Sequence, residues 1–215
     1  MKGFDQNYWT ENYSQPNTMD CIGNAQDHAR YLKAFFQLEK VDVSSIIDLG
    51  AGYGHLFQKV LKSFLPYKAA AVESSKYAFD KLSKKKLAPV DSTEVVLYFE
   101  TIEDWCLRSN TGKNRYDLAL CTSVFQYLDE ETLKTVVENI SQKIKYIYLT
   151  VPTDKELKKQ RDDLDFNDRY ALKRSRSFYK KVLSKHFTNI SSKIWESKYY
   201  FNEETTLFTD LLYRS

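Results

Sequence analysis

Three of the six glycines in this 215-residue chain lie at alternate positions in one short stretch, as Gly50, Gly52 and Gly54. The acidic residue Asp48 ends the apolar run before them, and a helical pattern follows directly after them. Glycines at a strand-to-helix turn leave the backbone uncovered, so that a ligand can approach the main chain and the positive end of the helix. This stretch therefore predicts a cradle for a small molecule.

The spacing of the glycines separates this cradle from two other glycine-rich loops. A dinucleotide-binding loop reads G-x-G-x-x-G, and its third glycine packs the helix on the strand, whereas His55 stands at that place here. A phosphate-binding P-loop ends in Gly-Lys-Ser or Gly-Lys-Thr, which this stretch lacks. A nicotinamide-dependent oxidoreductase is therefore disfavoured, although it stays open as an alternative.

A second acidic residue, Glu73, follows the cradle by about twenty residues, at the end of the next apolar run. A carboxylate in this place can accept hydrogen bonds from both hydroxyls of a ribose. Together with the cradle, Glu73 indicates a ligand of nucleotide type.

The acidic residue, apolar residue and G-x-G-x-G of residues 48–54 resemble motif I of the class I S-adenosylmethionine-dependent methyltransferases. The resemblance implies S-adenosylmethionine as cofactor and S-adenosylhomocysteine as product. It implies that the loop backbone approaches the methionine moiety, that Asp48 reaches its ammonium directly or through water, and that Glu73 binds the ribose. The cofactor-binding residues that it implies are Asp48, Gly50, Ala51, Gly52, Glu73, Ser74, Thr101, Ile102, Cys121 and Thr122.

Two later segments also resemble this family. Residues 103–105, Glu-Asp-Trp, look like its acidic pair followed by an apolar residue, which assigns the adenine amino group to the Thr101 side chain and the ring to the Ile102 backbone. Glu100 is the alternative to Thr101. Residues 116–128 resemble motif IV, which implies that the main chain near Cys121 helps to hold the methionine moiety.

Strands and helices must alternate to place these residues together. The apolar runs predict strands at 45–48, 69–72, 95–98, 116–121 and 146–151, and helices at 25–39, 54–64, 76–87, 130–140 and 177–186. This order predicts an α/β fold, a single-domain doubly wound Rossmann-like sheet that is mostly parallel. Two more runs, 190–195 and 206–213, predict a closing hairpin with an antiparallel last strand. The site residues follow strand ends, where open α/β sheets bind ligands.

We expect residues 1–43 to form an aromatic leader and a helix that cap the methyltransferase domain at 44–215, within which 153–176 is a charged insertion. Tyr8, Trp9 and Tyr13 of the leader suggest the hypothesis that it closes over a small or amphipathic acceptor. The first residues show no apolar signal segment and no run reaches membrane-spanning length, so a cytoplasmic location is expected.

The catalytic residue is not identified by the sequence. Tyr127, His28 and His55 are candidate bases, and a structural role is favoured for each. The three cysteines are far apart and no metal site is expected.

The sequence favours a small-molecule methyl acceptor. An Asn/Asp-Pro-Pro-Tyr motif for amino methylation of DNA bases is absent after the fourth strand, and the net charge of +3 does not demand nucleic acid. An RNA or protein acceptor bound by the basic segment 158–176 stays open, and so does a non-catalytic methyltransferase-like module that binds a partner. The oligomeric state is not indicated.

Overall fold

The computed structural model describes residues 4–12, 21–109, 112–208 and 214–215. It contains two compact units. We call residues 1–105 with 116–120 the N-terminal unit, and residues 106–115 with 121–215 the C-terminal unit. The division that we predicted at residue 44 stays a prediction.

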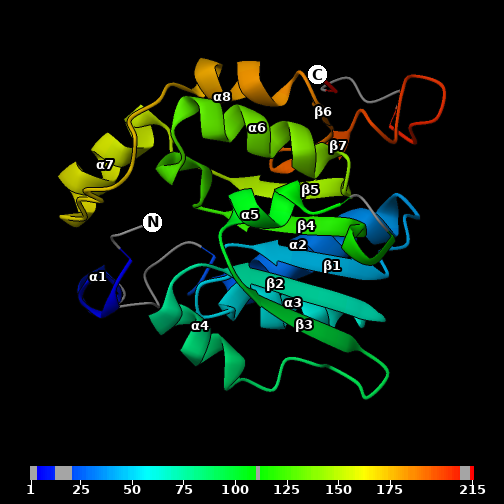
Figure 1. Ribbon diagram of the computed structural model, residues 1–215. Coiled ribbons are helices and arrows are strands. Elements are labelled where there is room, and N and C mark those ends of the chain that lie inside the picture. Colours follow the sequence, from blue (N-terminus) through cyan, green and yellow to red (C-terminus); the bar gives the residue numbers. More distant parts are fainter. Residues whose placement is uncertain (1–3, 13–20, 110–111, 209–213) are drawn as a thin grey trace. The chain divides into compact units, whose positions relative to one another are not determined.

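One seven-stranded sheet has the strand order β3-β2-β1-β4-β5-β7-β6 (Figure 1). Its strands are β1 (Ser45–Leu49), β2 (Lys68–Glu73), β3 (Glu94–Phe99), β4 (Tyr116–Thr122), β5 (Ile144–Thr150), β6 (Phe187–Asn189) and β7 (Ile194–Ser197). Strand β1 pairs in parallel with β2 and β4, and β2 pairs in parallel with β3. Strand β7 is antiparallel to both β5 and β6. The predicted mostly parallel α/β fold with an antiparallel end is confirmed.

The N-terminal unit surrounds the two central strands, β1 and β2. Its helices are α1 (Gln6–Asn12), α2 (Ala25–Leu38), α3 (His55–Phe64), α4 (Lys76–Ser83) and the start of α5 (Ile102–Leu107). All five residues of β1 are buried, because a parallel strand between two neighbours is covered on both faces. Helices α2 and α3 pack on each other, with the rings of Phe36 and Phe64 6.2 Å apart.

The C-terminal unit holds the other end of the sheet. Its helices are α6 (Glu130–Ser141), α7 (Asp154–Leu164) and α8 (Arg176–Leu183), with the short turns η2 (Gly112–Asn114) and η3 (Phe125–Tyr127). Thr153 and Glu156 form a capping box at the start of α7, which has no buried residue. No helix in the described part of the chain combines the length and the apolar character needed to cross a bilayer.

The prediction for the closing hairpin was right in kind and wrong in place. The hairpin is formed by β6 and β7, whereas Thr206 and Phe208 belong to no strand, and residues 209–213 lie outside the described residues. Thr206 donates its hydroxyl to the buried Glu196 carboxylate at 2.9 Å, and the Phe208 ring lies 6.2 Å from that of Tyr146. The alternate burial of Thr206 and Phe208 therefore reflects packing against the end of the sheet. The helix predicted to reach residue 87 ends at Ser83.

Candidate cofactor site

The turn between β1 and α3 is built by three glycines in the left-handed region, with φ of 82° at Gly50, 54° at Gly52 and 70° at Gly54. The N–H groups of Gly50 and Ala51 both donate to the Val72 carbonyl, at 2.9 and 3.1 Å, which ties the turn to β2. L-residues with a side chain rarely adopt such angles, so the alternate glycines are required by the backbone itself. The predicted glycine turn between strand and helix is present, and its role as a cradle for a ligand stays a prediction.

Gly54 also has a packing role. A Cβ atom at this position would overlap Cδ1 of Leu82 on α4. The third glycine thus lets α3 approach α4, in a position one residue earlier than the packing glycine of a dinucleotide loop.

Asp48 lies at the carboxyl end of β1, only 3% exposed. Its Oδ1 atom has no hydrogen-bond partner among the described residues. Burial, and then the nearby charge of Glu73, raises the pKa of Asp48 to about 8. A buried carboxyl group without a partner is costly unless a cation or a donor compensates it, so this position is suited to a positively charged ligand group.

Glu73 ends β2 and is 6% exposed. Its carboxylate accepts from the Gly52 N–H and from the Ser75 N–H, each at 2.7 Å. Burial raises the pKa of Glu73, while its hydrogen bonds to Ser75, Gly52 and Ser74 oppose that rise. Because an ionised carboxylate has about four lone-pair directions, Glu73 can hold the glycine turn and still accept ligand hydroxyls.

Helix α1 of the leader lies against this turn. The Trp9 indole N–H donates to Ser75 Oγ at 2.8 Å, and the Trp9 ring lies 4.8 Å from the Tyr53 ring. Trp9 Cη2 would be 3.2 Å from a Cβ atom built on Gly52. Trp9 is 6% exposed and Tyr8 is also buried, so the leader has a fixed place beside the cradle. Tyr13 lies outside the described residues, and closure over an acceptor stays a prediction.

The other predicted residues lie at the start of α5 and at the end of β4. Thr101 caps α5, since its hydroxyl donates to Asp104 Oδ2 at 2.9 Å and accepts from the Asp104 N–H at 3.1 Å. Ile102 is the first residue of α5, where a helix offers no carbonyl to its N–H. The N-terminal unit therefore brings Asp48, residues 50–52, Glu73 and Ser74 together, with residues 101 and 102 after the neighbouring strand β3. Cys121, buried, and Thr122, half-buried, end β4 and belong to the C-terminal unit.

The candidate bases have structural surroundings. His28 is buried with its Nε2 3.8 Å from Cys21 Sγ. His55 begins α3, where burial, and then the charges of Lys85 and Lys59, lower its pKa. Tyr127 donates its hydroxyl to Asp168 Oδ2 at 2.6 Å. The catalytic residue stays unidentified.

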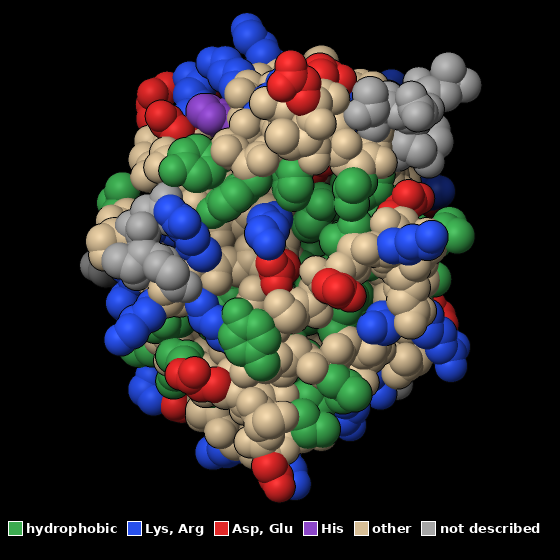
Figure 2. Space-filling view, turned by 90° about the vertical axis from the view of Figure 1, so that its right-hand side faces the viewer, with side chains coloured by type: hydrophobic (Ala, Val, Ile, Leu, Met, Phe, Trp, Pro, Cys, Tyr) green, Lys and Arg blue, Asp and Glu red, His purple; other side chains and the backbone are tan. Residues whose placement is uncertain are grey.

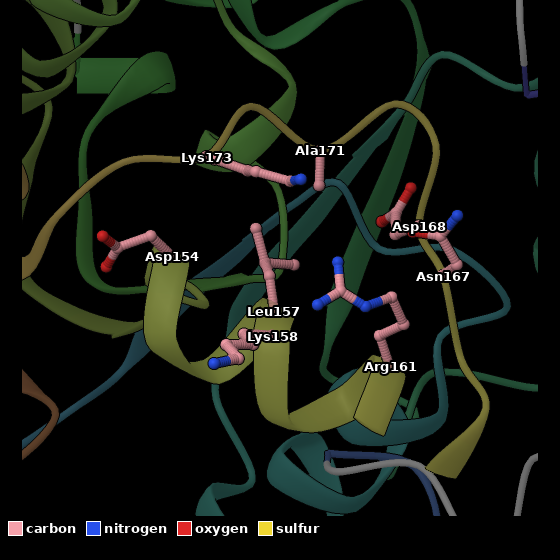
Figure 3. A pocket seen from close by; sticks show the side chains of 8 residues that line it. All are labelled: Asp154, Leu157, Lys158, Arg161, Asn167, Asp168, Ala171 and Lys173. Carbon is pink, nitrogen blue, oxygen red and sulfur yellow. The ribbon is translucent and has the colours of Figure 1, made fainter. Parts of the chain in front are cut away.

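A cavity of about 210 Å³ lies in the C-terminal unit, between α7 and the segment that follows it (Figure 3). Basic and acidic side chains line it together with Leu157 and Ala171. The sequence did not predict this cavity, because residues 153–176 were expected only to form a charged insertion. Residues 154, 157, 158 and 161 all line it. They follow the pattern i, i+3, i+4, i+7, which places side chains on one face of α7.

Acidic and basic side chains are mixed over the face of the molecule drawn in Figure 2. Among the described residues of this face, lysine and arginine are interspersed with aspartate and glutamate and form no continuous basic stripe. This face therefore lacks the concentrated positive charge typical of a surface that binds nucleic acid.

No protein-family model and no curated protein sequence matches this chain. Solved structures do match it. A S-adenosylmethionine-dependent methyltransferase from Clostridium acetobutylicum has a TM-score of 0.66 and 12% identity over 89% of this chain and 98% of that one. The plantazolicin methyltransferase BpumL, in complex with SAH, has a TM-score of 0.62 and 15% identity, over 83% of this chain and 66% of that one. A small RNA methyltransferase has a TM-score of 0.60 and 16% identity, over 81% of this chain and 25% of that one.

The strand order and these likenesses define a Rossmann-like α/β fold of the kind found in methyltransferases. More particularly, it is the fold of the class I S-adenosylmethionine-dependent methyltransferases, as the sequence motifs had indicated. Identities of 12% to 16% establish this shared fold alone.

Proposed function

We propose that this protein is a S-adenosylmethionine-dependent methyltransferase that binds its cofactor at the glycine turn. The observation that carries the proposal is Asp48, a buried carboxyl group with an unpartnered oxygen and a pKa raised to about 8. None of the described residues pairs with that oxygen. The ammonium of a methionine moiety would supply the missing partner as both a cation and a hydrogen-bond donor.

Each part of the site has its own task in this proposal. Asp48 orients the amino-acid end of the cofactor, Glu73 accepts from the ribose hydroxyls, and the exposed backbone of the glycine turn lets the ligand lie close to β1. The Ile102 N–H and the Thr101 side chain would contact the adenine. When bound, the cofactor supplies a methyl group already activated on a sulfonium.

What these residues contribute to catalysis is position. Holding a reacting group in line can lower a barrier by about 7–11 kcal/mol in favourable cases. Such a transfer requires a general base only where the acceptor must first lose a proton. A general base is therefore part of this site only for an acceptor of that kind.

We further propose a small-molecule acceptor. Support comes from the modest cavity in the C-terminal unit and from the mixed charges of the drawn face. An RNA acceptor is the second candidate, because a small RNA methyltransferase is among the structures that share the fold. It predicts binding to an oligoribonucleotide that weakens steeply with salt.

Calorimetric titration with S-adenosylhomocysteine tests the cofactor. We expect micromolar-scale binding to the wild-type protein and no binding of NAD. Glu73→Ala should weaken binding by about tenfold or more, since it removes hydrogen bonds made by a charged group. Glu73→Gln keeps the shape and serves as a second variant where Glu73→Ala does not fold, as judged by circular dichroism.

Folded wild-type protein that does not bind S-adenosylhomocysteine would contradict the proposal and favour the non-catalytic binding module. Binding of NAD with similar affinity would instead favour the oxidoreductase alternative. Equal affinity in wild type and both Glu73 variants would remove Glu73 from the site.

A further inference from the structure

Hydrogen bonds hold both segments that border the cavity, helix α7 and the segment that returns after it. The capping box at Thr153 and Glu156 holds the start of the helix, with the Thr153 N–H donating to Glu156 Oε2 at 2.8 Å. The returning segment is held by two backbone bonds of 2.8 Å each, from the Asp154 N–H to the Arg174 carbonyl and from the Leu172 N–H to the Gln126 carbonyl. A site of this kind can bind a ligand without first ordering a loop, which lowers the entropic cost of binding.

Three cations and two carboxylates line the cavity. The cations are Lys158, Arg161 and Lys173. Within the described residues, Lys158 and Lys173 make no hydrogen bond or ion pair, and Arg161 pairs only with the neighbouring Asp162, at 3.2 Å. That pair is half exposed and so contributes little stability.

The two carboxylates of the cavity already have partners. Asp168 accepts from the Tyr127 hydroxyl at 2.6 Å and from the Tyr170 N–H at 3.2 Å. Asp154 accepts from the Lys155 N–H at 2.9 Å. Both carboxylates accept hydrogen bonds from the protein itself but keep their charge, so that three cations face two anions in the lining, and the basic side chains keep donors to offer.

Figure 3 shows the Arg161 and Lys173 side chains reaching from α7 and from the returning segment toward the same opening. Asp154 and Lys158 lie toward its rim in the same view. Leu157 and Ala171 give the cavity an apolar wall. A guanidinium and an ammonium that converge beside an apolar wall are suited to an oxyanion carried on an apolar body.

We propose that this cavity binds the carboxylate or phosphate group of a small molecule, with Arg161 and Lys173 as its binding residues. At about 210 Å³ the cavity is smaller than the 300–1,000 Å³ typical of a site for a whole drug-sized ligand. It therefore takes the acidic end of a ligand, or a ligand of the size of a substituted benzoate.

Calorimetric titrations of the protein test the site. The probes are benzoate, phenyl phosphate and the neutral benzamide. We expect both acids to bind and benzamide to bind at least about tenfold more weakly, because it lacks the charge. The double variant Arg161→Ala, Lys173→Ala should bind both acids more weakly by about tenfold or more. The control Lys159→Ala removes a cation of α7 that does not line the cavity and should change nothing.

Benzoate binding without phenyl phosphate binding identifies a carboxylate site, and the reverse identifies a phosphate site; either result supports the proposal. Equal binding of benzamide, or unchanged acid binding in the double variant, overturns it. An oligoribonucleotide that binds through Lys159 as strongly as through Arg161 and Lys173 overturns it in favour of an RNA surface. Failure of both acids to bind the wild-type protein overturns it as well.

Discussion

At the scale of single residues, the buried carboxyl group of Asp48 lowers the stability of the ligand-free fold, and the ammonium partner that we propose would offset this cost. A carboxyl group whose pKa is raised by folding keeps its proton in the native state while the unfolded chain has lost it. Between the ordinary aspartate pKa of 3.8 and the raised pKa of about 8, stability therefore falls as pH rises. At neutral pH the uncompensated group destabilises the ligand-free protein.

Asp48→Asn removes this titration and keeps the shape of the side chain. We expect the variant to be more stable than wild type at pH 7 without ligand, with Tm higher by about 2–4 °C for each 1 kcal/mol gained. We expect S-adenosylhomocysteine to bind it at least about tenfold more weakly. Thermal unfolding at pH 5 and pH 8 gives the check, since the gain should grow with pH. A variant less stable than wild type at pH 8 would refute this account of Asp48.

The same pKa makes cofactor binding depend on pH. Below about 8, Asp48 must release a proton before it can pair with an ammonium. Affinity for S-adenosylhomocysteine should therefore rise by up to about tenfold per pH unit between pH 6 and 8 and then level off. Titrations at pH 6, 7 and 8, repeated in buffers of different ionisation enthalpy, measure both the slope and the released proton. Asp48→Asn should show a flat profile; a slope that persists in this variant would assign the proton to another group.

Gly54 tests the packing of the turn. Gly54→Ala forces a side chain into a φ of 70° and into Leu82, so we expect a loss of about 1–3 kcal/mol, or a Tm lower by several degrees. Denaturant unfolding measures this loss. Adding Leu82→Ala opens the space and should recover the steric part, so that the double variant is less destabilised than the sum of the two single variants. Strict additivity would show that the strain is in the backbone alone.

At the scale of elements, helix α1 is held beside the turn by tertiary contacts. It has only seven residues, too few to be stable alone, so contacts such as those of Trp9 with Ser75 and Tyr53 set its place. Trp9→Ala should increase hydrogen exchange of the described leader residues by about tenfold or more. Trp9→Phe keeps an aromatic ring beside Tyr53 without the indole N–H. Its rate of hydrogen exchange should lie between those of the wild type and of Trp9→Ala. Exchange unchanged in Trp9→Ala would mean that other contacts hold α1.

The elements themselves were largely predictable, because each strand and helix carries its apolar period within its own residues. The closing hairpin was misplaced where this local rule fails: Thr206 and Phe208 alternate as in a strand, yet they pack on Glu196 and Tyr146. The apolar period of a segment indicates which of its residues are buried, and residues can be buried without belonging to a strand or helix.

The candidate site also has features that the sequence predicted and features that it did not. Gly50, Gly52 and Asp48 were predicted, because a left-handed turn needs glycine and the acid is fixed to it in sequence. The contact between Trp9 and the turn was not, since it joins segments far apart in the chain. The cavity at α7 was not predicted either, because Arg161 and Lys173 meet only through the fold of the returning segment.

At the scale of the whole molecule, strand β4 belongs to both units, with Tyr116–Leu120 in one and Cys121–Thr122 in the other. Because this one strand runs without a break through both units, we expect one cooperative transition on heating. A ligand that binds only the native state stabilises it by mass action, about 2.7 kcal/mol at a hundredfold excess over Kd. For 215 residues this corresponds to a rise in Tm of about 5–10 °C.

Differential scanning calorimetry with S-adenosylhomocysteine measures this coupling between the site and the fold. Because the glycine turn and Glu73 belong to the N-terminal unit, a shift of the whole transition would mean that the C-terminal unit shares the stabilisation. NAD should give no shift in Tm. The Asp48→Asn variant should lose most of the shift caused by S-adenosylhomocysteine, although its ligand-free Tm is higher than that of the wild type. Two transitions, of which the ligand moves one, would contradict the prediction and show that the units unfold separately.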